Sequence, residues 1–515
     1  MANNINANNK RIAKNTLFLY FRTILVMVVS LYTSRVVLDT LGITDYGIYN
    51  VVGGVVAMFG MVSSSLSSAI SRFITFELGR GNTDKLRRIF STSINIQLGI
   101  SLIVVVLGET LGLWFLNHKM SIPAERVPAA NWVLHCSLLT FAINLISIPY
   151  NAAIIAHERM SVFAYVSLLE VTLKLAVTYL LYVSLWDKLI FYSLLLVAVA
   201  LCIRLVYGAY CSRHFEEAKY EFFHDHSLVK EMAGFAGWNF IGSSSALLRD
   251  QGGNIVINLF CGPAVNAARG VATHVNSAIN GFVSNFMTAL KPQITKSYAV
   301  GNRAYMMQLI FQGARLSFYL LLLLSLPVII NAPFILSLWL KTVPDHTVQF
   351  VRLVLLFAMS ESISHPLITA MQATGRIRNY QIVVGGLQMM NLPVSYILLR
   401  MGCIPEAVLY VAIAISQCCL AARLYMLRGM IKLQVRKYLK EVYCNVCIVA
   451  FCSALIPYLL SDRLPVTFAT FMLNIAVSLF CTVTVVYLIG CNRGERRFIQ
   501  AKIQGSRFLR SPKIH

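Results

Sequence analysis

Long apolar runs, separated by short polar segments, account for most of this chain. A helix crosses about 30 Å of hydrocarbon with about 20 apolar residues, because it rises about 1.5 Å per residue. We count fourteen such runs, and three of them contain more polar residues than the rest, near Met58, Ser244 and Ala278. The pattern predicts an all-α polytopic membrane protein with about fourteen transmembrane helices. The predicted spans are centred near Met27, Met58, Leu102, Phe141, Leu173, Ala198, Ser244, Ala278, Leu320, Met359, Leu387, Ile413, Cys452 and Val477.

Two stretches of the chain carry the same plan, 220 residues apart. Residues 35–90 hold the end of one apolar run, a tight Leu41-Gly42 turn, a second run rich in Gly and Ser, and a basic loop. Residues 255–310 repeat this order, and ten of the 56 paired positions are identical. Shared composition accounts for part of this match. The identical pairs include Gly42 with Gly262, Ala69 with Ala289, Ile74 with Ile294, Thr75 with Thr295, Gly81 with Gly301, and Asn82 with Asn302.

A second match lies at nearly the same spacing. Residues 149–159 (PYNAAIIAHER) pair with residues 366–376 (PLITAMQATGR), a shift of 217 positions. Two ordered matches at nearly one spacing indicate a duplicated half, which is the sequence signature of a transporter built from internal repeats. Each half holds six spans, so both enter the membrane from the same side. The halves are then related by a pseudo-twofold axis along the membrane normal.

The repeats predict how the chain divides. Two six-helix lobes are joined by a linker and followed by two extra transmembrane helices and a basic tail. The predicted parts are residues 1–211 (N-terminal lobe), 212–230 (cytoplasmic linker), 231–430 (C-terminal lobe), 431–490 (two extra helices) and 491–515 (basic cytoplasmic tail).

Composition and charge agree with a membrane protein. Hydrophobic residues make up 57% of the chain and charged residues 13%, against about 25% charged in soluble domains. The net charge is +23, but the basic residues lie in short loops at alternate span ends rather than on one soluble face, which argues against nucleic acid as a partner. If the N terminus is cytoplasmic, 29 of the 44 Lys and Arg lie inside and six lie outside. The positive-inside rule therefore predicts that both termini are cytoplasmic.

Cofactor and metal chemistry find no support in the sequence. The twelve cysteines lie mostly in or beside apolar runs and form no metal-ligand cluster, so we interpret them as small core residues. A phosphate-binding Gly-Lys loop of the ATPase kind is also missing. We therefore expect no cofactor, no metal and no enzyme activity, with transport driven by an ion gradient or by the gradient of the substrate. The N-terminal tail is polar and basic, so we expect no cleavable signal peptide.

Charged residues inside the predicted spans are the first candidates for function, because they are costly in lipid unless they face protein or water. Arginine presents a planar fork of donors that binds phosphate oxygens bidentately. Several of these residues also have a structural explanation: Arg35 can pair with Asp39, Lys174 can pair with Glu170, and Arg22 and Arg204 can extend to the interface. The candidate cavity residues with charge are Arg22, Arg35, Lys174, Arg204, Arg249 and Arg269.

Polar residues at helical spacing form stripes in corresponding spans of both halves. Such stripes either line a hydrated cavity or join helices, because small polar residues allow close packing. Among them we select Asn280 and Ser284 as candidate cavity residues. The stripes are Ser64, Ser67, Ser68 and Ser71 in one half, and Asn239, Ser243, Asn254 and Asn258 together with Thr273, Ser277, Asn280, Ser284 and Thr288 in the other.

Three titratable residues are candidates for ion coupling. Asp250 lies within the seventh span, and Glu361 and His365 lie four residues apart in the tenth span, just before Pro366. A carboxylate and an imidazole in contact within a membrane can carry a proton relay. A local structural hydrogen bond between them is the alternative.

The first three spans resemble a known family. The turn LGxxxYGxY (Leu41, Gly42, Tyr46, Gly47 and Tyr49), the following span that ends in Ser71-Arg72-Phe73, and the basic Gly-Asn loop are similar to the polysaccharide-exporter branch of the multidrug/oligosaccharidyl-lipid/polysaccharide (MOP) flippase superfamily, with its Wzx-type O-antigen flippases. The resemblance implies a MATE-like fold in the bacterial inner membrane, and alternating access that moves undecaprenyl-diphosphate-linked oligosaccharide from the inner to the outer leaflet. It also implies membrane lipids, this glycan, and the polysaccharide polymerase and assembly proteins as partners.

Two other functions stay open. A cation-coupled multidrug antiporter of the same superfamily carries an acidic residue deep in its first or seventh span, and Asp250 keeps this alternative open. A non-transporting scaffold of a polysaccharide assembly complex is the third class, although a scaffold has no need of paired polar stripes. Assays of surface polysaccharide and of dye efflux separate these functions.

Overall fold

The computed structural model describes residues 2–57, 59–120, 122–221, 225–340, 343–463, 465, 467–492, 494–496 and 500. This part of the chain is helical and contains no strand. Most of the basic tail predicted at 491–515 lies outside the described residues. The all-α fold class expected from the apolar runs is confirmed.

The described part of the first repeat contains seven α-helices. They are α1 (Ala2–Ala57), α2 (Gly60–Arg80), α3 (Thr83–Leu107), α4 (Leu113–Lys119), α5 (Val127–Ala156), α6 (Met160–Val183) and α7 (Lys188–His214), with the short turns η1 (Gly108–Gly112), η2 (Ala124–Arg126) and η3 (Glu216–Ala218).

The second repeat and the extra helices follow. They are α8 (His226–Ala299), α9 (Arg303–Ile330), α10 (Ala332–Trp339), α11 (Thr347–Ser362), α12 (His365–Thr374), α13 (Arg378–Met389), α14 (Asn391–Arg400), α15 (Ala407–Ile431), α16 (Val435–Tyr438), η4 (Leu439–Cys444), α17 (Asn445–Arg463), α18 (Phe468–Val485) and η5 (Val486–Gly490).

Eleven of the predicted spans are long and apolar enough to cross a membrane in the part of the chain that the structure describes. The other three are the spans that contain more polar residues, and each corresponds to a helical segment that is less apolar than the eleven. The span predicted near Met58 covers the end of α1 together with α2, and Met58 itself lies outside the described residues. Those near Ser244 and Ala278 are the two parts of the long helix α8. The expected number of fourteen is therefore not confirmed by the apolar criterion alone.

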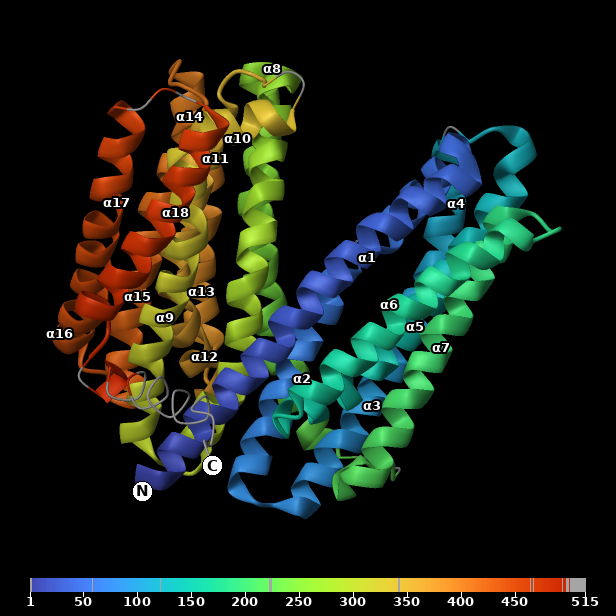
Figure 1. Ribbon diagram of the computed structural model, residues 1–515. Helices are drawn as coiled ribbons and strands as arrows, with labels where there is room; N and C mark the ends of the chain where they lie inside the picture. The colour runs from blue at the N-terminus through green and yellow to red at the C-terminus, as the bar shows by residue number, and fades with distance from the viewer. Residues whose placement is uncertain are drawn as a thin grey trace, which may run out of the picture. The chain divides into compact units, whose positions relative to one another are not determined.

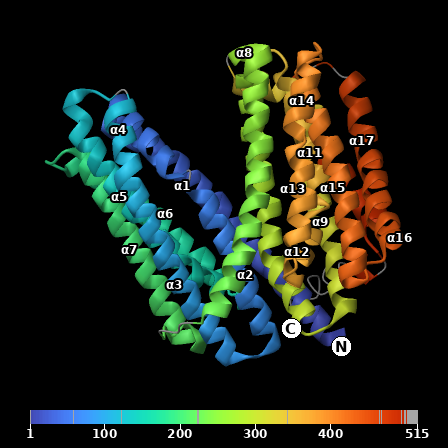
Figure 2. The ribbon, with the colours of Figure 1, turned by 180° about the vertical axis from the view of Figure 1, so that it is seen from behind.

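The chain forms two compact units. Unit 1 contains residues 1–244, 288–306 and 369–382, and unit 2 contains the rest. Within unit 1, α5 packs against both α3 and α7, and these helices run side by side in both views of the ribbon (Figures 1 and 2). Within unit 2, α11 packs against α15, and the extra helices α17 and α18 pack against each other. The predicted lobe boundaries at 211 and 231 stay a prediction.

Matching positions of the two repeats adopt matching backbone conformations. Gly42 interrupts α1 at φ 78° and ψ 169°, and Gly262 interrupts α8 at φ 82° and ψ 177°. A residue without a Cβ adopts these angles at little cost, which explains why both repeats place Gly there. Asn82 and Asn302 each accept a hydrogen bond from the backbone N–H three residues later, at the start of the next helix. The turns read from the sequence therefore have the same geometry in both halves.

A polar contact between helix N-caps recurs in the two repeats. In unit 1, Arg126 precedes α5 and its Nη1 lies 2.5 Å from an oxygen of Asp187, the N-cap of α7. In unit 2, His346 precedes α11 and its Nδ1 lies 2.7 Å from an oxygen of Glu406, which precedes α15. In each repeat this pair fixes the start of the fourth transmembrane helix against the start of the sixth.

A packed core in unit 2 holds the two parts of α8 against α11. Ile257, Ala268 and Phe350 are fully buried there, with Val256 and Leu336 nearly so. Because lipid tails are as apolar as these side chains, close van der Waals packing stabilises the contact more than removal from water does. The core places the polar residues of α8 at fixed positions on either side of Gly262.

Candidate functional site

Two arginines and one aspartate of α8 form a charged cluster in unit 2. Two guanidinium nitrogens of Arg249 donate to the carboxylate of the neighbouring Asp250, Nε to Oδ1 at 2.8 Å and Nη2 to Oδ2 at 3.3 Å. Arg269 lies beyond the Gly262 kink, and its Nη2 donates to the backbone oxygen of Asp250 at 3.3 Å. The kink therefore brings together two guanidinium groups that are 20 residues apart in the sequence.

The two arginines are largely buried, whereas the aspartate is open. Arg269 is 7% exposed, and among the described residues its Nη1 has no hydrogen-bond partner. The side chain of Arg249 is 13% exposed and that of Asp250 is 58% exposed. A buried donor without a partner costs free energy unless a ligand or water occupies it. The cluster carries two positive charges and one negative charge, so it can accept a further anion.

Close packing positions the Arg269 side chain. A Cβ placed on Gly253 would lie 2.4 Å from its Nη1 and 2.7 Å from its Nη2. Only glycine leaves room for the guanidinium at this point of α8. The location of the charge therefore depends on a residue that carries no side chain.

Glu361 is the centre of a second polar cluster in unit 2. Its Oε1 accepts a hydrogen bond from the Ser416 hydroxyl at 2.6 Å. Ser416 also contacts the hydroxyl of Ser360 at 3.0 Å, and Gln417 donates to Ser360 at 2.5 Å. The Tyr443 hydroxyl donates to Gln417 at 3.0 Å, so hydrogen bonds connect η4 with α11 through α15.

Several cations lie close enough to Glu361 to act on its charge. They are Arg423, Arg249 and, when it is protonated, His365. Arg423 on α15 is 1% exposed, and our sequence analysis did not select it. Glu361 and His365 do not share one continuous helix, because α11 ends at Ser362 and α12 begins at His365. The predicted proton relay between them stays a prediction.

The stripe on the second part of α8 is mostly exposed. Thr273 and Ser277 donate their hydroxyls to backbone oxygens of their own helix, and both are exposed, as is Ser284. Asn280 is half-buried and donates to Asn276 at 2.7 Å. The choice between a hydrated cavity and helix contact for this stripe stays a prediction.

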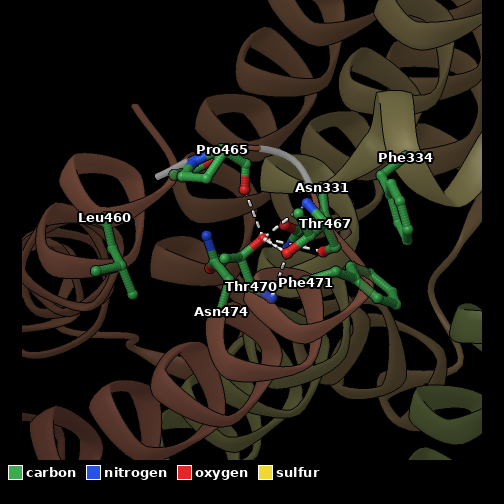
Figure 3. A pocket seen from close by; sticks show the side chains of 9 residues that line it. Asn331, Phe334, Leu460, Pro465, Thr467, Thr470, Phe471 and Asn474 are labelled. Atoms are coloured by element: carbon green, nitrogen blue, oxygen red, sulfur yellow. Dashed lines mark hydrogen bonds between the residues drawn. The ribbon is translucent and has the colours of Figure 1, made fainter. Parts of the chain in front are cut away.

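A pocket at the ends of α17 and α18 illustrates polar residues with a local role. Figure 3 shows Asn331, Thr467, Thr470 and Asn474 around it. The Asn331 and Asn474 amides donate to the backbone oxygens of Pro327 and Pro457, at 2.8 Å and 3.3 Å. Thr467 and Thr470 form a capping box at the start of α18. Since these groups bind each other or the backbone, this pocket is not the candidate site.

Comparison with known proteins places the chain in a protein family. Residues 12–298 match a protein family described as polysaccharide biosynthesis protein. The chain belongs to this family. No curated protein sequence matches the chain.

Solved structures similar to this polysaccharide biosynthesis family member are transporters. One is an outward-facing multidrug resistance MATE family transporter of the MOP superfamily, with TM-score 0.71 and 12% identity over 82% of this chain and 96% of that one. Another is a MOP superfamily transporter from Pyrococcus furiosus, described as having a binding pocket of reverse polarity that suggests a different function. Its TM-score is 0.70 at 12% identity, over 82% of this chain and 96% of that one. The MATE transporter ClbM in complex with Rb⁺ covers 95% of this chain and 97% of its own, with TM-score 0.59 and 13% identity.

These matches confirm the MATE-like fold and the resemblance to polysaccharide exporters of the MOP superfamily. The chain thus has the fold of known transporters, and eleven of its described helices are long and apolar enough to cross a membrane.

In unit 1 of this family member, three of the predicted cavity residues have local partners. Arg22 lies over the Phe163 ring at 4.6 Å, and Arg204 lies over the Tyr150 ring at 3.9 Å. Lys174 pairs with Glu170 at 2.6 Å, as the structural alternative expected. Arg35 is exposed, and within the described residues no ion pair joins it to Asp39. These contacts favour a structural role for Arg22, Arg204 and Lys174, and their role in substrate binding stays a prediction.

Charged residues that the sequence analysis did not select are also buried here. Glu158 is 5% exposed, and Arg423 is 1% exposed. Glu158 did carry a signal, because the repeat match pairs it with Gly375 and thus indicates an unusual backbone conformation. Arg423 carried no comparable signal, since one charge at the end of an apolar run is ordinary.

Proposed function

We propose that this polysaccharide biosynthesis family member moves undecaprenyl-diphosphate-linked oligosaccharide from the inner to the outer leaflet by alternating access. The observation that carries the proposal is the pair Arg249 and Arg269 on the kinked helix α8. Two arginine forks lie around a single exposed aspartate, and Arg269 offers a buried donor without a partner in the described residues.

The geometry suits a diphosphate. Each guanidinium can bind two phosphate oxygens, and charge-assisted hydrogen bonds of this kind are about twice as strong as neutral ones. Asp250 is mostly exposed, so it can turn toward water when an anion replaces it as the partner of Arg249. The exposed stripe with Ser284 and the amide of Asn280 offer hydrogen bonds to sugar hydroxyls. Undecaprenyl lipid, the glycan and the polysaccharide assembly proteins are then the partners.

We further propose that Glu361 is the residue for ion coupling. It is a carboxylate in a membrane-spanning helix, bound to Ser416 and near the cation Arg249. Protonation of Glu361 would remove a negative charge that competes with the substrate for Arg249. Asp250 and His365 stay further candidates for coupling.

Complementation of a flippase-deficient strain tests the proposal, with activity normalised to the amount of protein in the membrane. Arg249→Ala and Arg269→Ala should lower surface polysaccharide about tenfold or more, since each removes charge-assisted hydrogen bonds. The surface polysaccharide of the Lys variants should lie between that of the parent and that of the Ala variants, because Lys keeps the charge and loses the bidentate guanidinium geometry. Arg400→Ala, an exposed arginine of α14, is the matched control and should be fully active. Full activity of both Ala variants would show that neither arginine binds the substrate.

The alternative is a cation-coupled multidrug antiporter. One of the similar structures is described as a multidrug resistance transporter. Asp250 is the acidic residue that such a transporter needs. Here, however, both oxygens of Asp250 bind Arg249, which leaves little charge for a cationic drug. Dye efflux that is lost in a deletion strain with normal surface polysaccharide would favour the antiporter. Normal dye efflux and normal polysaccharide export, together with loss of the polysaccharide assembly complex, would favour a scaffold.

We propose the bacterial inner membrane as the location, with both termini cytoplasmic. A single cysteine at Asn82 should then react only with a reagent that reaches the cytoplasm. A cysteine at Asn117 should react from the periplasm. The reverse pattern would invert the direction of transport.

A further inference from the structure

Glu158 is a buried charge in a strained turn. It lies between α5 and α6 in unit 1. Its backbone φ is 60°, which residues other than Gly, Asn and Asp rarely adopt. Its side chain is 1% exposed. A strained residue with a buried charge persists only where its surroundings hold it in place.

Four side chains bind this one residue. Its carboxylate accepts from Arg11 Nε at 2.7 Å, Lys296 Nζ at 2.7 Å and Gln293 Nε2 at 2.5 Å. Its backbone oxygen accepts from the Asn15 amide at 3.1 Å. Arg11 and Asn15 come from α1 of the first repeat, whereas Gln293 and Lys296 come from the end of α8 in the second. All these segments belong to unit 1.

The second repeat makes the equivalent contact in the opposite direction. Gly375 pairs with Glu158 in the repeat match and has φ 76° in the turn between α12 and α13. This turn lies against Arg72 of α2, whose Nη2 donates to the Ala373 oxygen at 3.3 Å. Arg72 also lies over the rings of Phe73 and Phe76, at 4.6 Å and 4.7 Å. In the repeat alignment, these two phenylalanines take the positions of Gln293 and Lys296.

The turn of each repeat thus binds the end of the second transmembrane helix of the other repeat. One contact is ionic and the other is made by an arginine among aromatic rings. We infer that Glu158, with Arg11, Gln293 and Lys296, forms an ionic latch that closes this end of unit 1 during transport. The inference goes beyond the proposed substrate, because closing an end of the transporter does not depend on what is carried.

The chemistry of the latch explains why it switches between two states. Loss of Gln293 and Lys296 leaves the Glu158 carboxylate with Arg11 alone, whose side chain is 49% exposed, and a buried carboxylate that loses partners is costly unless water reaches it. Separation of the second repeat from this end exposes Glu158 and Lys296 to water together, which restores their solvation. The latch therefore opens when Gln293 and Lys296 leave Glu158, which stays paired with Arg11 of its own repeat. Access from this end requires the open form.

Crosslinking measures the closure directly. A Cβ placed on Gly79 of α2 would lie 3.1 Å from the Cβ of Ala299 and 3.1 Å from the Cα of Lys296 in α8. This is closer than the about 3.5–4.5 Å between the Cβ atoms of a disulfide, so a Gly79→Cys, Ala299→Cys pair forms a disulfide after a small local shift when this end is closed. The pair is introduced where the twelve native cysteines have been replaced, with a protease site at Lys219 between the repeats. After oxidation and cleavage, crosslinked fragments stay together on a non-reducing gel.

Glu158→Gly is the decisive variant. Glycine adopts the left-handed turn without strain, as Gly375 does in the second repeat, so the variant loses the carboxylate and keeps the backbone. We expect its initial crosslinking rate to fall about tenfold, and that of Lys296→Met to fall in the same direction. Glu77→Gln is the matched control, since Glu77 is an equally buried carboxylate of unit 1 that pairs with Lys85 at 2.9 Å inside the first repeat.

Two results would overturn the latch. One is a parental crosslinking rate in Glu158→Gly. The other is an equal fall in Glu77→Gln, which would show a general loss of structure. The measurement needs no lipid-linked substrate, so its failure is separate from a failure of the proposed function.

Discussion

Replacing Gly253 by alanine separates the position of the Arg269 charge from its presence. The new Cβ would lie 2.4 Å from Nη1, whereas ordinary contact begins at 3.4 Å. The backbone of α8 is fixed by the helix, so the guanidinium must move by about 1 Å. Alanine also favours the helix by about 1 kcal/mol relative to glycine. The variant should therefore be at least as stable as the parent and have its arginine displaced.

The expected effect follows from the hydrogen bonds that depend on this position. Charge-assisted bonds contribute about 1.5–3 kcal/mol each, and about 1.4 kcal/mol changes an equilibrium constant tenfold. Loss of one such bond to the diphosphate should weaken binding about tenfold to a hundredfold. Because the displaced fork keeps its charge, we expect the lower end, about tenfold.

The assay compares transport per molecule of membrane protein in Gly253→Ala, Arg269→Ala and the parent. Gly253→Ala should lie between the other two, with undiminished thermal stability in detergent. Gly237→Ala is the control, because a Cβ there meets nothing within 4 Å on the same helix. Parental transport by Gly253→Ala, alongside a loss in Arg269→Ala, would refute the argument that the position of the fork matters. Parental transport by both would remove Arg269 from the site.

Two further predictions concern stability. Burial alone would raise the pKa of Glu217, but the hydrogen bond from His157 holds it below its ordinary value of 4.5. The pair therefore stabilises the fold above that value, and the stabilisation is lost as pH falls through the lower pKa of the folded state. Melting scans between about pH 6 and pH 3 should show this loss, and Glu217→Gln should show a smaller one. An unchanged pH profile in that variant would contradict the role of the pair. Arg126→Ala leaves the carboxylates of Asp45 and Asp187 without their shared partner, and should lower the free energy of unfolding by about 2 kcal/mol, less than a fully buried pair because Arg126 is 30% exposed. Arg126→Lys should recover part of this, and equal stability of all three proteins would show that the N-cap ion pair is unimportant.

The fold could be predicted from the sequence because it depends on properties of short stretches of chain. Apolar runs of sufficient length predict membrane helices because the bilayer has a fixed thickness. Within the described residues, helical segments lie at all of the predicted spans, although only eleven are apolar enough to qualify by themselves. The repeated glycines Gly42 and Gly262 were equally readable, since a positive φ is a property of one residue and its backbone. The family resemblance was readable for the same reason, because its motifs lie in these turns.

Partners across the structure were decided only by the tertiary fold. Lys174 pairs with Glu170 one turn away, so helical spacing was enough to name this partner. Glu361 binds Ser416, 55 residues away, and Glu158 binds Lys296, 138 residues away. No periodicity connects such positions, because their separation depends on how whole helices pack.

The candidate site shows both contributions in one helix. The sequence selected Arg249 and Arg269 because an arginine within a span is costly in lipid. It could not show that the kink at Gly262 brings both to Asp250, or that Gly253 leaves room for one guanidinium. Residue type is a local property and was determined by the sequence itself. The direction and neighbours of each charge depend on the helix bend and on packing at distances of a few ångströms, which only the folded chain fixes.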